Sequence, residues 1–572
     1  MKNIFITMIC GTMIFLTACE KELDLPPLDS ITDQELAFSR TEMELYANQF
    51  YTMLPNFESM VYGDLSSDNM IYFTYLFNGR LAGTIVVPES GGGWSWGTIR
   101  ALNYFLANYR KTQEPIETVG PYIGEIHFFK AYAYFNLLQA FGDLPWLSAP
   151  LNTDSEELFD PRLSRSVIAD SILVNLDKAI TLLNPKNATP AGRVNKDAAL
   201  AFQSRVALYE GSWEKYHAGT PFGVANSDPN KYFRKAADAA KQLMDTGGYS
   251  IHSTGDIEGD YWRLFNQEDL QANPEVILWR DYDVEFGFSG THQAQNRLLS
   301  DGTFGSVSKQ LVDSYLTTDG TPISVSALYQ GDATVELAVA NRDPRLTQTI
   351  YQIGHVQRIV GVDTTYYERP FLNLPARNAN TTGYQLFKGT DPDAPGGGPG
   401  GQASTTANPI FRYAEVLLNY AEAKAELGEV DQAVLDESVN LLRDRVGMPH
   451  MDANIGFTDA DWEFPSLSPL INEIRRERKV ELACENFRFH DIMRWRAHHL
   501  ILRPLTGAPF AQFENMPWSP PLGEIKVDDN GYIYPFKDTP GWQFDPAIHY
   551  LSPLPTQQLV LNPNLTQNPG YD

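Results

Sequence analysis

Apolar residues recur at helical spacing in seven stretches of the chain. In residues 124–143 one helical face would collect the side chains of Ile126, Phe129, Ala133, Leu137 and Phe141. The other stretches cover residues 166–183, 195–213, 231–245, 411–429, 431–447 and 471–499. Most of them begin after a polar or proline-containing turn and end near glycine, as capped helices do. The pattern predicts helical hairpins, in which consecutive helices are joined by short polar loops.

The stretches 411–429 and 431–447 have small residues where two helices would cross. Ala421, Ala425 and Ala433 allow a close approach, and Leu427-Gly428 ends the first helix. The pair resembles a tetratricopeptide unit, and residues 166–216 repeat the plan less regularly. We therefore expect an all-α scaffold of stacked helix pairs.

Two long segments interrupt this scaffold. Residues 60–98 combine Gly, Trp and Tyr with short apolar patches, and residues 250–410 hold strand-like runs such as EVILWRDY at 275–282. Loops carried by a rigid frame are the usual place for binding residues. The interruptions are thus where we expect the functional surface.

The N-terminus has the pattern of an export signal. Lys2 precedes an apolar run from Ile4 to Leu16, which is too short to cross a bilayer core of about 30 Å. Leu16-Thr17-Ala18-Cys19 resembles the lipobox of bacterial lipoproteins, which implies a signal peptide over 1–18 and a lipid-modified Cys19. The alternative is an ordinary cleaved signal with a chance cysteine.

Composition narrows the class of protein. The chain of 572 residues is 43% hydrophobic and 20% charged, which is typical of globular proteins. Its formal net charge of -27 argues against nucleic acid as a partner. Beyond Cys10 and Cys19 the sequence has only Cys484, so we expect no intramolecular disulfide. Aromatic residues make up 12% of the chain, enough to supply a stacking surface.

Catalytic motifs are weak. Ser306-x-x-Lys309 and Ser67-Asp68-Asn69 match two parts of the penicillin-recognising enzyme pattern, but their order is reversed and no Lys-Thr-Gly follows. The spacing of His490, His498 and His499 does not suit a metal, which favours surface or ion-pairing roles. We therefore expect no enzyme activity, no cofactor and no metal site.

The segment 471–499 is dense in charges of both signs. Arg475, Arg476, Arg478 and Lys479 could form an anion site. The favoured interpretation is ion pairing within the helix, with the neighbouring Glu473, Glu477, Glu481 and Glu485. Under that interpretation the buried stripe consists of Val480, Cys484 and Phe487.

Aromatic clusters are the remaining candidates for a binding site. Trp94 and Trp96 follow three glycines and precede a helix expected near Thr98. A second cluster consists of Tyr261, Trp262, Tyr282, Phe286 and Phe288. Flat rings beside polar groups suit a sugar, because its C–H face stacks on the ring while its hydroxyls form hydrogen bonds. Core packing is the alternative for each ring.

Five ordered segments resemble the signatures of SusD/RagB outer-membrane lipoproteins. They are KAYAYFNLLQAFGDLPW, AGRVNKDAALAFQSRVALYEGSW, FRYAEVLLNYAEAKAELGE, IRRERKVELACENFRFHDIMRW and YLSPLPTQQLVLNPNLTQNPGYD. The resemblance implies a right-handed superhelix of tetratricopeptide-like helix pairs with long irregular insertions and a few short strands. It also implies an N-terminal region over 19–250 and a C-terminal region over 251–572 that form one continuous structural unit.

The resemblance implies a cell-surface protein that captures a nutrient, mostly glycans, and covers a SusC-like TonB-dependent transporter. By this likeness Trp94, Trp96 and the Tyr282 to Phe288 loop would stack on the ligand, with Asp68 and Arg80 as candidate hydrogen-bonding partners. A non-catalytic glycan-binding lipoprotein of the outer membrane is the leading hypothesis. The alternatives are a binder of peptides or another nutrient on the same scaffold and a surface hydrolase.

Overall fold

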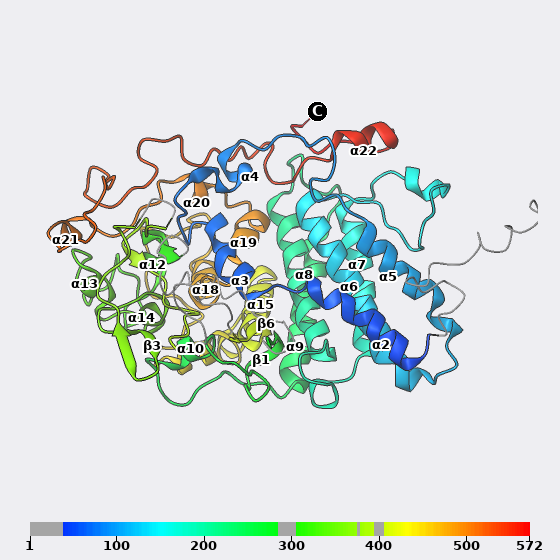
Figure 1. Ribbon diagram of the computed structural model, residues 1–572, viewed down its shortest axis with the longest axis horizontal. Coiled ribbons are helices and arrows are strands. Elements are labelled where there is room, and N and C mark those ends of the chain that lie inside the picture. The colour runs from blue at the N-terminus through cyan, green and yellow to red at the C-terminus, as the bar shows by residue number, and fades with distance from the viewer. Residues whose placement is uncertain (1–37, 284–304, 375–377, 394–404, 572) are drawn as a thin grey trace, which may run out of the picture.

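The computed structural model describes residues 38–283, 305–374, 378–393 and 405–571 (Figure 1). The predicted signal peptide, Cys19, Phe286 and Phe288 lie outside these residues. The helices of the first half are α2 (Arg40–Asn48), α3 (Phe57–Gly63), α4 (Gly79–Ala82), α5 (Gly97–Asn108), α6 (Ile116–Phe141), α7 (Arg165–Leu182), α8 (Lys196–Tyr216), α9 (Pro229–Thr246) and α10 (Asp260–Arg263).

The second half has shorter helices. They are α12 (Lys309–Ser314), α13 (Val335–Val339), α14 (Arg345–Thr349), α15 (Tyr413–Glu426), α16 (Gln432–Asp436), α17 (Val439–Arg445), α18 (Pro469–Glu481), α19 (Arg488–Arg494), α20 (His499–Leu502), α21 (Ala511–Glu514) and α22 (Thr556–Leu561).

The long helices pack in chain order. Helix α6 contacts α7, α7 contacts α8, α8 contacts α9, and α15 packs on both α8 and α9. Figure 1 shows α5 to α9 side by side from the centre to the right, while α10, α12, α13, α14 and α21 lie on the left. The pattern-based prediction of a mainly helical scaffold of consecutive helix pairs is confirmed. After α15 the chain turns at Gly428, whose φ of 71° suits glycine.

The strands are few and short. Strand β1 (Val276–Arg280), which lies within the predicted strand-like run, pairs antiparallel with β6 (Asn408–Arg412). This pairing brings the end of the long insertion back to its beginning. The other pairs are β2 (Ser306–Val307) with β5 (Tyr384–Gln385) and β3 (Val356–Val360) with β4 (Asp363–Tyr366).

The prediction of one continuous helix over 471–499 is wrong. Helix α18 ends at Glu481, and α19 begins at Arg488. Between them Cys484 and Asn486 have φ values of 60° and 66°. The Cys484 amide donates to Asp64 Oδ2 at 2.8 Å, and a Cβ on Gly63 would lie 2.0 Å from Asn486 Oδ1. This contact with the end of α3 breaks the helix despite its periodic sequence.

The stretch 431–447 is also divided, because α16 ends before Ser438 and α17 begins after it. The largest hydrophobic core cluster includes side chains from both sequence regions, among them Phe128 of α6, Leu278 of β1 and Phe411 of β6. The helices of the first half and the strands of the second therefore share one core.

The charged side chains of α18 form ion pairs, but the prediction that they pair mainly with one another within the helix is wrong. Within the helix, Arg476 pairs with Glu473. The other pairs join α18 to the rest of the chain: Arg475 with Glu426, Arg478 with Asp491, and Lys479 with Asp68 and Glu463. Val480 and Cys484 are buried as predicted, whereas Phe487 is half-buried.

Candidate functional site

The tryptophan pair follows the glycine turn as expected, directly before α5. Trp94 is only 7% exposed, and its ring packs edge-on against Phe141 of α6 at 5.1 Å. Trp96 is half-buried and lies 5.2 Å from Trp94 and 6.1 Å from Tyr134. Trp94 is therefore a core residue, which corrects its prediction as a ligand contact, and only Trp96 presents part of a ring to solvent.

The second predicted cluster is divided between separate environments. Tyr261 is fully buried, and its hydroxyl donates to the carbonyl oxygen of Glu481 at 2.8 Å. Tyr282 is buried too, and its hydroxyl accepts from the Phe57 amide at 3.1 Å. Both rings belong to the scaffold rather than to a ligand surface. Trp262 is half-buried and stacks on Phe387 with centroids 4.8 Å apart.

Asp68 and Arg80 also stabilise the scaffold. Asp68 is fully buried and pairs with Arg488 at 2.7 Å and Lys479 at 3.3 Å. Burial alone would raise the pKa of Asp68, but the charges of Arg488 and Lys479 outweigh it and hold the pKa well below its usual value. The Arg80 guanidinium donates to the carbonyl oxygens of His549 and Tyr550. These contacts leave Asp68 unavailable to a ligand and clamp Arg80 to the C-terminal segment.

An exposed ring cluster lies a few residues before Arg80. It consists of Tyr72, Phe73 and Phe77, with ring centroids 4.5 Å apart for Tyr72 and Phe73 and 4.6 Å apart for Tyr72 and Phe77. Phe73 is 38% exposed and Phe77 is 46% exposed. Tyr72 is half-buried and packs on the second core cluster, so the two phenylalanines are presented to solvent from a fixed base.

The backbone around the ring cluster is held by short-range caps and long-range hydrogen bonds. Thr74 caps the 3₁₀ turn Tyr75–Phe77, and the Asn78 side chain accepts from the Arg80 amide that opens α4. The Ile71 amide donates to the Ser306 carbonyl oxygen at 2.9 Å. Such an arrangement presents rings with little loss of conformational freedom on binding.

The ring cluster falls in the predicted interruption 60–98, but the sequence-based candidates did not include it. The available signal is the segment IYFTYLFNGR at 71–80, in which four aromatic side chains precede the polar capping residue Asn78 within seven positions. Trp94 and Trp96 were predicted from their place between three glycines and a helix, but a large ring in such a loop can equally pack into the core.

The weak catalytic motifs do not form an active site. The Ser306 hydroxyl oxygen accepts from the Thr381 amide, and the Lys309 ammonium pairs with Asp332 at 2.6 Å and Asp313 at 2.9 Å. The lysine is therefore committed to carboxylates rather than placed as a base for the serine. Among the described residues no group of three or more His, Cys, Asp or Glu side chains is arranged to hold a metal ion.

His499 is exposed, as predicted, whereas His490 and His498 differ from the predicted surface or ion-pairing roles. His490 Nδ1 lies 3.1 Å from Gln139 Nε2, and burial lowers the pKa of His490 to about 4, so the ring is neutral. His498 bonds to the Tyr550 hydroxyl, and His499 bonds to the Glu463 carbonyl oxygen. His490 lines a cavity between α6, α8 and α19.

Comparison with known proteins gives the family. A family model described as the SusD family matches residues 274–571, and a model described as "Starch-binding associating with outer membrane" matches residues 95–208. The chain belongs to the SusD family. This SusD-family chain is 24% identical to SusD-like protein P38 of Formosa agariphila over 543 residues, which cover 88% of this chain and 94% of that protein.

Solved structures share the SusD fold. A SusD-like carbohydrate-binding protein from Bacteroides fragilis matches with a TM-score of 0.70 and 24% identity, over 93% of this chain and 99% of that one. Another SusD-like protein from the same species matches with a TM-score of 0.72 and 23% identity, over 96% and 100% of the two chains. The fold prediction is thus confirmed. Across the described residues, no helix has the length and apolar character needed to cross a membrane.

Proposed function

We propose that this SusD-family protein is a non-catalytic, glycan-binding lipoprotein of the outer membrane. In this proposal it captures oligosaccharide or polysaccharide at the cell surface and delivers it to a SusC-like TonB-dependent transporter. The observation that carries the proposal is the exposed ring cluster on a rigid base. Support comes from the starch-binding description of the matched family model and from a structure of the same fold that contains a xylogluco-oligosaccharide, with a TM-score of 0.58 and 17% identity.

The proposed contact is stacking between sugar rings and Phe73 and Phe77. A pyranose has an apolar C–H face, and an exposed phenyl ring offers a flat surface of matching size. The partial exposure of Trp96 makes its indole a further proposed contact. Weak contacts of this kind add up along a polymer that engages several of them at once.

We expect Phe77→Ala to weaken retention of the cognate polysaccharide strongly without lowering the melting temperature. Truncating a stacked ring costs about 1 to 3 kcal/mol by analogy with other aromatic platforms, which is roughly 5- to 150-fold in affinity. Phe77 is 46% exposed, so its loss leaves the core unchanged. Affinity electrophoresis in gels containing candidate polysaccharides, together with thermal melts, measures both effects.

Trp94→Ala is the matched contrast for this test, because it removes a larger ring that is buried. That variant should lose stability instead, by about 3 to 5 kcal/mol, as buried aromatic truncations do. Unchanged polysaccharide binding by a Phe73→Ala/Phe77→Ala double variant would contradict the proposed contact. Binding of peptides alone in a screen over both ligand classes would overturn the glycan proposal.

The proposed anchor is the lipid carried by Cys19. We expect Cys19→Ala to yield a detached protein after export, because Cys19 is the proposed attachment point. Cell fractionation in a strain that lacks the partner transporter measures this, with Cys484→Ala as the matched cysteine control. A Cys19→Ala protein that stays tightly bound to membranes in that strain would refute the proposed lipid anchor.

The proposed partner is the SusC-like transporter. Purification of the wild-type protein in mild detergent should recover the SusC-like barrel with it, and recovery of a free monomer would refute the partnership.

A further inference from the structure

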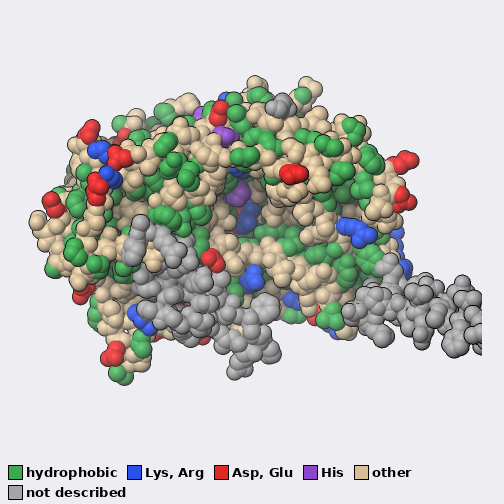
Figure 2. Space-filling view, turned by 45° about the horizontal axis from the view of Figure 1, so that its top comes forward, with side chains coloured by type: hydrophobic (Ala, Val, Ile, Leu, Met, Phe, Trp, Pro, Cys, Tyr) green, Lys and Arg blue, Asp and Glu red, His purple; other side chains and the backbone are tan. Residues whose placement is uncertain are grey.

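A cavity of about 170 Å³ lies where the helices of the first half meet those of the second. It is lined by side chains of α3, α6, α8, β6, α15, α18 and α19, and by the turn before α19. Figure 2 shows one face of the molecule hollowed near its middle, with histidine and basic side chains inside the hollow. In another protein a cavity of about 150 Å³ accommodates benzene, so this space has the size of one six-membered ring.

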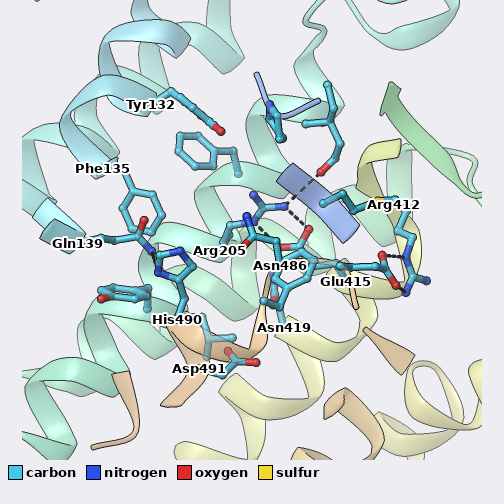
Figure 3. Close-up of a pocket in the computed structure, with 18 of the residues that line it drawn as sticks. Tyr132, Phe135, Gln139, Arg205, Arg412, Glu415, Asn419, Asn486, His490 and Asp491 are labelled. Carbon is cyan, nitrogen blue, oxygen red and sulfur yellow. Dashed lines mark hydrogen bonds and ion pairs between the residues drawn. The ribbon is translucent and has the colours of Figure 1, made fainter. Parts of the chain in front are cut away.

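The walls of the cavity are partly aromatic. Tyr132 and Phe135 of α6, Tyr209 of α8 and Phe487 of the turn line it. Figure 3 shows Tyr132, Arg205 and Asn486 gathered around the same space from different elements. The exposed Asn136 also lines the cavity, which connects it with the surface. Flat walls with polar groups between them suit a ring that has apolar faces and a polar edge.

One buried polar atom of the lining has no hydrogen-bond partner in the part of the chain that the structure describes. Asn408 is fully buried, and its Oδ1 atom is an acceptor without a donor. Its Nδ2 atom is used, because it donates to the Pro55 carbonyl oxygen at 3.2 Å. Tyr132 and Tyr209 also line the cavity, and burial raises the pKa of both, so their hydroxyls are neutral and can donate a hydrogen bond. Buried polar atoms in native proteins nearly always have a partner, which points to a ligand or water.

The charged groups of the cavity are already neutralised. Arg205 pairs with Glu415 at 2.6 Å, and Arg412 pairs with Glu485 at 2.7 Å. Asp491 pairs with both Arg478 and Arg494 at 2.8 Å. An anion or a cation would have to compete with these pairs, whereas hydroxyl groups can both donate to Asn408 Oδ1 and accept from the tyrosines.

We infer that this cavity binds one small, uncharged, polyhydroxylated ring molecule, the size of a single hexose. Four features agree on that chemistry: the size of the cavity, its flat aromatic walls, the unpartnered acceptor of Asn408, and the pairing of the charged side chains. The site is separate from the exposed ring cluster, and the inference does not depend on glycan capture there. The ligand would be either a free monosaccharide or the terminal unit of a longer chain that enters past Asn136.

The test uses the full-length protein in mild detergent, with D-glucose, D-galactose, D-mannose and myo-inositol as probes. Isothermal titration calorimetry measures affinity, and saturation-transfer difference NMR reports which ligand protons contact the protein. Tyr132→Phe and Tyr209→Phe remove one hydroxyl each while keeping the ring, so each should weaken binding about five- to tenfold. Tyr571→Phe is the matched control, because its hydroxyl donates to the Leu551 carbonyl oxygen outside the cavity.

Thermal melts of the tyrosine variants separate a loss of binding from a loss of folding. D-glucuronate and inorganic phosphate test the charge argument, and preferential binding of either would overturn the inference. Failure of all four neutral probes would overturn it as well. Binding that vanishes in Phe77→Ala but survives in both tyrosine variants would place the sugar on the ring cluster, which overturns the cavity site and leaves the proposed function standing. Maltotriose distinguishes the two sources of the ligand. If maltotriose competes with D-glucose for the cavity, the cavity accepts the terminal unit of a chain; if it does not compete, the cavity accepts only the free sugar.

Discussion

Replacing Glu481 by glutamine should lower the free energy of unfolding by about 3 to 5 kcal/mol. Glu481 is fully buried at the end of α18 and accepts from Arg445 at 2.6 Å, Arg412 at 2.7 Å and Arg345 at 2.9 Å. Burial would raise the pKa of this carboxyl group, but the three guanidinium charges outweigh it and hold the pKa well below its ordinary value. The amide keeps the shape and removes the charge, so three buried cations lose a shared counterion.

This effect should extend over several elements, because the three arginines come from α14, β6 and α17. Guanidinium unfolding followed by circular dichroism measures the change as a shift of the midpoint. Glu524→Gln is the matched control. Glu524 pairs with Lys526 on the surface, with side-chain exposures of 78% and 38%, and should cost less than about 1 kcal/mol. Equal midpoints for the two variants would show that the buried network does not stabilise the fold.

The same network shows what the sequence could and could not predict. The charge density of α18 predicted ion pairs within the helix, but most of its pairs are formed with residues of other elements. Glu481 and Arg345, for example, are separated by 136 positions. Helical spacing locates a neighbour one turn away and contains no signal for a partner on another element.

The helices were predictable where one continuous apolar face meets the core, as in α6 and α8. The break after Glu481 was not predictable, because it depends on a hydrogen bond from the Cys484 amide to the Asp64 carboxylate, 420 positions away.

The sequence also could not predict which aromatic rings are exposed to solvent. Trp94 and Phe77 both lie in irregular segments, and only the packing of Trp94 against Phe141 separates a core ring from a surface ring. The cavity could not be predicted at all, since Gln139 and His490 meet across 351 positions.

The stability of the protein should fall as the pH rises from about 4.5 to about 7, through the carboxyl group of Glu214. Glu214 is 1% exposed on α8, and neither of its oxygens has a hydrogen-bond partner among the described residues. Burial, together with the nearby Glu210 charge, raises the pKa of Glu214 from its ordinary value of about 4.5 to about 7. Between these two values the unfolded chain releases the proton while the folded protein keeps it.

The sign follows from proton linkage. The folded state binds more protons in this window, so the free energy of unfolding decreases with rising pH, by about 3 kcal/mol in total at roughly 1.4 kcal/mol per pKa unit. Below about 4.5 both states hold the proton, and above about 7 both are ionised, so this contribution is constant on either side. The cost is the burial of an unpaired carboxylate, and it is fully present at pH 8.

Glu214→Gln removes the titrating group and retains the shape, so the difference in stability between variant and wild type should change with pH. The variant should gain about 3 kcal/mol relative to wild type between pH 4.5 and pH 8, measured as unfolding midpoints at both values. Glu524→Gln, on the surface, should not reproduce this gain. If the variant and the wild type differed in free energy of unfolding by the same amount at both pH values, Glu214 would be ionised in the folded protein at both. That result would require a partner for its carboxylate which the described residues do not supply.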